Sequence, residues 1–205
     1  MKNIQILIIF LFSIGISAQN ITEINSDLKL SDSLTFDTEI RIYQGGGITN
    51  YSSLFRMFKD KSEKWTAEFY EHYAKVNGET ELQTEKQTLK SENDIELVYL
   101  NLLRSHILDL PSLTEIQWKL ETRGEVEKVK RKHRGKVKEE YEILSKRKTI
   151  VDGEGYQFQA RGWKFNEFEV SNPDRYLEYY PEVDELIFTC EILNIIRNEF
   201  GIWQK

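Results

Sequence analysis

The residues best placed to do chemistry in this 205-residue chain are the cations of one short basic stretch. Residues 128–138 contain seven Lys and Arg side chains and no acid. Like charges at this density repel one another, so we expect an exposed segment, either a mobile loop or a twisted hairpin around Gly135. Such a segment attracts polyanions: nucleic acid, anionic lipid head groups or an acidic protein surface. The side chains predicted to make this contact are Lys128, Lys130, Arg131, Lys132, Arg134 and Lys136.

The charge of the whole chain is unevenly spread around this stretch. Residues 119–148 hold twelve Lys and Arg against six Glu, which gives them a net charge of +6. Since the chain carries −6 in total, the remaining residues carry −12. An alternative interpretation gives the stretch no binding role. In that case Val126, Val129 and Val137 anchor the strands of a solvated hairpin, and Glu139 and Glu140 pair with its cations.

Recognisable catalytic signatures are missing from the sequence. It contains no G-x-S-x-G nucleophile elbow, no phosphate-binding Gly-rich loop followed by Lys and Ser or Thr, and no H-E-x-x-H. The three histidines, His72, His106 and His133, fall on three different predicted elements, so neither a metal nor a cofactor is expected. His106 and Asp109 have i, i+3 spacing on a predicted helix, which favours a surface hydrogen bond. These absences favour a protein that is not an enzyme.

One pair of acids keeps an enzymatic alternative open. Glu167 and Glu169 would point to the same side of a predicted strand, close to the turn that carries Trp163, whose ring we expect in the core or as a lid over it. Two carboxylates whose environments separate their pKa values can act as general acid and base. Aromatic rings beside carboxylates are also how a glycan site would be built. A glycan-active or other hydrolase is therefore the alternative function, with a purely structural domain as a third.

The elements that must position these residues are predicted to be strands followed by helices. Residues 36–43 and 65–74 alternate apolar and polar side chains with a period of two, as half-buried strands do. Asn77-Gly78 is a strong signal for a type I′ turn, which would return the chain through residues 81–90. A second set of strands is predicted at about residues 156–160 and 165–170.

Two segments have the pattern of long, largely buried helices. Residues 94–110 are apolar around most of a helix, and Pro111 would end it. The last helix is expected to begin at Pro181 and to end at Gly201. We therefore expect an α+β fold, in which antiparallel sheet of about six to seven strands comes in two sets, each followed by a long apolar helix packed on the sheet.

The N-terminus has the layout of a secretory signal peptide. Lys2 precedes an apolar run at residues 6–12, and small residues lead to expected cleavage after Ala18 or Gln19. Residues 1–19 are thus the predicted signal, and residues 20–205 form a single α+β domain with a basic exposed segment at about 121–148. Cys190 is the chain's only cysteine, so no disulfide can form within the chain, and its apolar neighbours predict a buried side chain.

Two stretches resemble small exported proteins of Bacteroidetes-type bacteria. They are the start of the chain, up to the junction Ser17-Ala18-Gln19-Asn20, and the closing residues 180–200, which together make up about a fifth of the chain. The resemblance implies export to the periplasm or the cell exterior, and it implies no activity. The sequence thus predicts an exported, non-enzymatic protein that binds an acidic protein or an anionic envelope polymer. Export disfavours nucleic acid as the partner.

Overall fold

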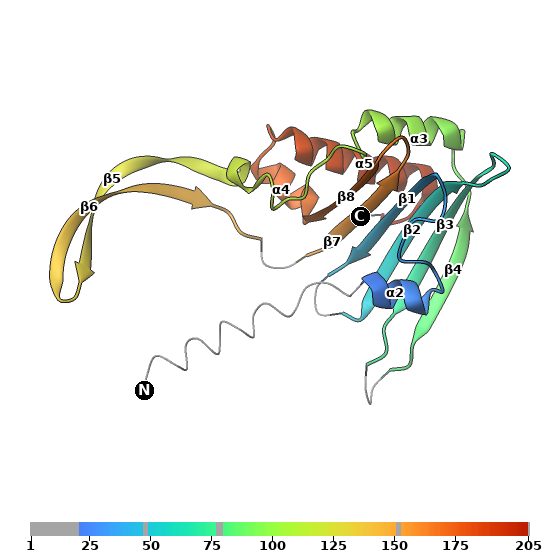
Figure 1. Cartoon of the computed structure of the whole chain (residues 1–205), viewed down its shortest axis with the longest axis horizontal. Helices are drawn as coiled ribbons and strands as arrows, with labels where there is room; N and C mark the ends of the chain where they lie inside the picture. The colour runs from blue at the N-terminus through green and yellow to red at the C-terminus, as the bar shows by residue number, and fades with distance from the viewer. Residues whose placement is uncertain (1–20, 47–48, 77–79, 151–152, 205) are drawn as a thin grey trace.

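The computed structural model describes residues 21–46, 49–76, 80–150 and 153–204 (Figure 1). The predicted signal peptide and the predicted Asn77-Gly78 turn lie outside the described residues. Within the described part of the chain, no helix is both long and apolar enough to cross a membrane.

Six antiparallel strands form the main sheet, in the order β4-β3-β2-β1-β7-β8. The first four make a meander, and β7 then pairs with the free side of β1, which places Ile40 beside both Met57 and Ala160. The strand bounds are β1 (Thr38–Gly45), β2 (Tyr51–Lys59), β3 (Trp65–Tyr73), β4 (Gln83–Leu89), β7 (Gly155–Arg161) and β8 (Phe165–Ser171).

The helices divide between the two faces of this sheet (Figure 1). The helices α3 (Ile95–Arg104), α4 (Pro173–Tyr179) and α5 (Asp184–Phe200) lie on one side, and a 3-10 turn, η1 (Gln117–Leu120), follows α3. The short helix α2 (Ile21–Asp27) lies against the opposite face, where Ile24 packs with Tyr43, Leu54 and Tyr70.

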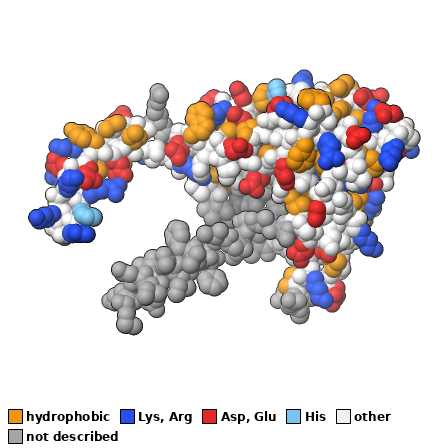
Figure 2. Space-filling view, in the orientation of Figure 1, with side chains coloured by type: hydrophobic (Ala, Val, Ile, Leu, Met, Phe, Trp, Pro, Cys, Tyr) orange, Lys and Arg blue, Asp and Glu red, His pale blue; other side chains and the backbone are white. Residues whose placement is uncertain are grey.

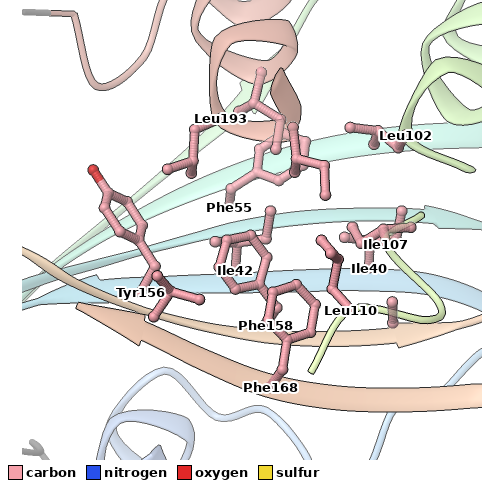
Figure 3. Close-up of a cluster of buried hydrophobic side chains, with 14 of the residues drawn as sticks. Ile40, Ile42, Phe55, Leu102, Ile107, Leu110, Tyr156, Phe158, Phe168 and Leu193 are labelled. Carbon is pink, nitrogen blue, oxygen red and sulfur yellow. The ribbon is translucent and has the colours of Figure 1, made fainter. Parts of the chain in front are cut away.

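The main core lies between the sheet and the helices α3 and α5 (Figure 3). Because side chains alternate along a strand, Ile40 and Ile42 of β1 point to this side, as does Phe158 of β7. The ring of Phe158 stacks on that of Phe168 with 4.3 Å between centroids. Leu193 of α5 closes the layer from above.

The predicted α+β class with antiparallel sheet is confirmed, but the finer arrangement is not. The two sets of strands join into one sheet, and only α5, with seventeen residues, is long. The predicted helix over 94–110 is wrong in its end, because α3 stops at Arg104. There Ser105 Oγ donates a hydrogen bond to the Asn101 carbonyl. His106 adopts φ 60°, a left-handed conformation that ends a right-handed helix. Helix α5 begins at Asp184, three residues after the predicted start at Pro181. It ends at Phe200, and Gly201 caps it with φ 68°, as predicted.

The sheet face opposite the core carries a buried network of charges. The Glu39 Oε1 atom accepts hydrogen bonds from Arg41 Nε and Arg56 Nε, each at 2.8 Å. Arg56 Nη1 reaches Glu68 Oε2 at 3.3 Å, and Lys86 Nζ lies 2.7 Å from Glu68 Oε1. Glu39 and Arg41 are fully buried, so each charge depends on the others for its stabilisation.

The same network binds the segment that covers it, residues 28–36. Glu39 Oε2 accepts the backbone N–H groups of Thr35 at 2.6 Å and Phe36 at 2.9 Å. Arg41 donates back to the carbonyl of Ser31. The segment is therefore held over the sheet by charge-assisted hydrogen bonds to its own backbone.

The environment of Glu39 also sets its ionisation. Burial alone would raise the pKa of its carboxyl group, but the hydrogen bond from Arg56 and the charge of Arg41 outweigh burial. The pKa of folded Glu39 therefore lies below the ordinary value of 4.5. The stability that ionised Glu39 contributes is complete above that pH and is lost as the pH falls through the folded pKa.

Replacing this carboxylate tests its role. Glu39→Gln should lower the free energy of unfolding at neutral pH by about 3 kcal/mol, because two buried guanidinium groups lose their counter-charge. It should also flatten the fall in stability below pH 4.5. Denaturant unfolding over a pH series measures both effects. Glu178→Gln, which changes an exposed carboxylate of α4, is the control. If the free energy of unfolding of Glu39→Gln fell below pH 4.5 as steeply as that of the unaltered protein, the role given to Glu39 would be wrong.

Candidate functional site

The basic segment folds as a two-stranded hairpin that projects from the body of the protein (Figure 1). We call this hairpin the arm; it consists of β5 (Glu121–His133) and β6 (Lys136–Arg147). Of the two forms expected for the segment, the structure contains the hairpin around Gly135. Arg134 and Gly135, the two residues between the strands, have φ values of 48° and 84°. Positive φ at both positions is what a two-residue type I′ turn requires.

All six predicted contact residues are exposed on this arm. Some of these six cations are paired within the arm: Lys128 lies 2.5 Å from Glu139, and Arg131 lies 2.5 Å from Glu142. The alternative of a solvated hairpin predicts that Glu139 and Glu140 pair with the arm's cations, and both acids are paired in this way. The cations that form no ion pair with a described residue surround the turn: Lys132, Arg134 and Lys136.

Apolar side chains share one face of the arm with several of its lysines. The register places Val126 opposite Ile143 and Lys128 opposite Tyr141, on the same face. Val126 is 65% exposed, Ile143 66% and Tyr141 75%. Figure 2 shows hydrophobic side chains along the arm and Lys and Arg side chains at its far end. Exposed apolar groups that share a face with cations are typical of an interaction surface.

The arm has little support from the rest of the fold. Its two strands contact mainly each other, and β5 also contacts η1 at the base. An isolated two-stranded hairpin is only marginally stable in water. The arm therefore depends for its stability mainly on the contacts between its own two strands.

A second polar cluster, missed in the sequence, joins Ser52, His72 and Asp27. Ser52 Oγ lies 2.9 Å from His72 Nδ1, and His72 Nε2 lies 2.8 Å from Asp27 Oδ2. The three residue types are those of a hydrolytic triad, but Ser52 and His72 are each only 1% exposed, so a substrate cannot reach Oγ. The cluster instead ties α2, which carries Asp27, to β3.

The acids predicted for a hydrolytic site do not form a shared cleft. Trp163, in the turn between β7 and β8, is 71% exposed rather than in the core, and Glu167 and Glu169 are exposed on β8. Glu167 accepts hydrogen bonds from the amides of Gln157 and Gln159 and lines a hollow of about 290 Å³, whose lining includes neither Glu169 nor Trp163. Two solvated acids that share no cleft with each other or with Trp163 give the hydrolase alternative no support in this geometry.

The remaining candidate residues have structural contacts. The expected hydrogen bond between His106 and Asp109 side chains is replaced by other contacts, since His106 packs against the ring of Phe188 and Asp109 pairs with Lys164. Cys190 is buried in α5, as its neighbours predicted.

Neither metal chemistry nor a relative points to an activity. In the part of the chain that the structure describes, no three His, Cys, Asp or Glu side chains gather as metal ligands would. Comparisons of the chain with models of protein families, with curated proteins and with solved structures found no match. The geometry of the arm is therefore the observation from which a function can be inferred.

The arm's independence from the body can be tested by removing it. The strand ends Glu121 and Arg147 are paired neighbours, so a short Gly-Ser linker can replace residues 121–147. We expect the unfolding temperature to change by less than about 2 °C, because the sheet and its core lose few contacts. Scanning calorimetry measures this. Phe158→Ala is the positive control, since emptying that core position should cost about 3 kcal/mol or more. Loss of cooperative unfolding in the shortened chain would contradict an independent arm.

Proposed function

We propose that this chain is an exported, non-enzymatic binding protein whose arm binds an anionic macromolecular partner, an acidic protein or an envelope polymer. The observation that carries the proposal is the projection of a basic and apolar hairpin from an otherwise acidic body. The predicted signal at residues 1–19 supports export to the periplasm or the cell exterior. A partner there meets the arm before it meets the body.

The shape of the arm supports contact with a large partner. A strand of thirteen residues, the length of β5, extends on the order of 40 Å at the usual rise per residue. Cations around Arg134 provide long-range attraction, and Val126, Tyr141 and Ile143 provide apolar area near the base. The cations at the tip would first attract the partner, and the apolar side chains along the arm would then be buried against it.

The charge arrangement also favours a partner over self-contact. The turn residues Arg134 and Gly135 lie at the end of the arm farthest from η1, and no carboxylate of the described body pairs with the cations there. Cations that are exposed and unpaired keep their full attraction for an external polyanion, screened only by salt. Binding through them should therefore weaken as the ionic strength rises.

Charge reversal tests the proposal directly. Protein expressed from the full chain is immobilised, incubated with an envelope extract of the source cell, and washed at low and high salt before mass spectrometry identifies what remains bound. We expect one or more acidic partners that are lost at high salt. Changing Lys130, Arg131, Lys132 and Arg134 to Glu should weaken binding of those partners at least tenfold and remove most of its salt dependence.

A matched variant distinguishes the effect of the arm's cations on binding from the effect of the protein's total charge. Lys61, Lys64, Lys90 and Arg175 are four exposed cations of the body, and changing them to Glu alters the total charge by the same amount. This control should bind like the unaltered protein. Equal losses in both variants would mean that total charge, and not the arm, governs binding. Unchanged affinity in the arm variant would overturn the proposal.

A further inference from the structure

A pocket of about 530 Å³ opens between one end of the sheet and the residues that follow α5. This volume falls within the range of small-molecule binding sites. Its walls come from the ends of β1, β2 and β3, from β4 and from residues 201–204, so segments far apart in the sequence meet there. The pocket is on the body, and no residue of the arm lines it.

Trp203 forms a fixed aromatic wall of this pocket. Its indole Nε1 donates to Ser53 Oγ at 2.8 Å, and its ring packs edge-on against Phe69 at 5.9 Å and Tyr156 at 5.8 Å. The backbone of Trp203 has φ 51°, a left-handed conformation that is uncommon for a bulky residue. Strained residues of this kind are frequent at binding sites, where the surrounding contacts hold them in place. The side chain is only partly buried, so part of the ring stays accessible.

Arg197 forms part of the wall of the same pocket and is held there by its neighbours. It is 5% exposed, and its Nη2 donates to Asp174 Oδ2 at 3.1 Å and to the Tyr156 hydroxyl at 3.4 Å. Its Nε is buried and has no hydrogen-bond partner among the described residues. Because Nε is closed to solvent, a ligand in the pocket would not reach it, and Arg197 serves as a fixed part of the wall.

The rim of the pocket is made of planar amides, which donate and accept hydrogen bonds, and of carboxylates, which only accept them. Three amides, from Gln44, Gln87 and Gln204, and two carboxylates, from Glu71 and Glu154, line it. Each carboxylate already accepts one hydroxyl, Glu71 from Tyr51 at 3.3 Å and Glu154 from Tyr156 at 2.7 Å, and keeps further acceptor sites.

These groups select the chemistry of a ligand. An anion would meet two carboxylates, while the nearby guanidinium of Arg197 is already paired with Asp174. A lipid tail would leave the polar rim unsatisfied. A sugar ring has hydroxyls for the amides and carboxylates and an apolar face for the indole of Trp203. We propose that this pocket binds one or two units of a neutral saccharide.

This inference is independent of the function proposed for the arm. It also differs from the hydrolase alternative, because it places a glycan at Trp203 rather than Trp163 and involves binding only. The contacts are between uncharged hydroxyls and fixed side chains, so the affinity should not depend on salt.

Saturation-transfer NMR tests the inference with chitotriose, cellotriose and maltotriose as probes, using protein expressed from the full chain. We expect at least one of these neutral trisaccharides to bind. Gln87→Ala should weaken its binding about fivefold, the effect of losing one hydrogen bond to a neutral group. Gln83→Ala is the matched control, because Gln83 is equally exposed on the same face of β4 and does not line the pocket.

A second pocket variant and a binding measurement on the charge-reversed protein complete the test. Glu154→Gln keeps the shape of a rim residue and should also weaken binding, with an unchanged unfolding temperature. The arm variant with four reversed charges should bind the saccharide normally, which separates this site from the arm. Failure of all three probes to bind would overturn the inference. Binding that neither Gln87→Ala nor Glu154→Gln weakens would overturn it equally.

Discussion

The buried carboxylate of Glu39 is the interaction around which both faces of the sheet are organised. Its two oxygens neutralise Arg41 and Arg56 and bind the backbone of Thr35 and Phe36. Because charges at this depth are tolerated only in a complete network, the covering segment 28–36 and the sheet must form together. The apolar side chains of β1 are thereby committed to the other face, where α3 and α5 bury them. One residue's ionisation thus supports the two-layer body on which the arm and the pocket depend.

The body and the arm differ in how they bury side chains and pair charges. In the body, the strands β1, β2 and β3 bury side chains on both faces, and charges are paired across neighbouring strands, as Glu68 is with Lys86. In the arm, both faces are open to solvent and the charges near Arg134 are left unpaired. The body therefore supplies the stability of the fold, whereas the arm is available for contact with other molecules. The pocket beside Trp203 belongs to the body, so its shape is set by the same packing that makes the core.

Local patterns in the sequence predict what is local in the structure. Alternation over residues 36–43 and 65–74 predicts strands where β1 and β3 form, and charge density predicts an exposed basic segment around Gly135. Contacts across the sheet are set by register and strand order, which no local pattern contains. For that reason the cluster of Ser52, His72 and Asp27, separated by twenty and forty-five residues, could not be predicted. The pocket requires residues from six separate stretches of the chain, so it too is visible only in the folded chain.

The pairing of β1 with β7 also determines how the chain must assemble. Ile40 and Ala160 are partners in this sheet, although about 120 residues separate them in the chain. The meander of β1 to β4 involves short loops, whereas the junction with β7 closes a long one, and such closures are slow steps in folding. The arm lies inside that loop. Since closure entropy grows only with the logarithm of loop length, the arm's 27 residues raise it by only about 0.2 kcal/mol. An arm of almost any length could therefore be carried by this body at little thermodynamic expense.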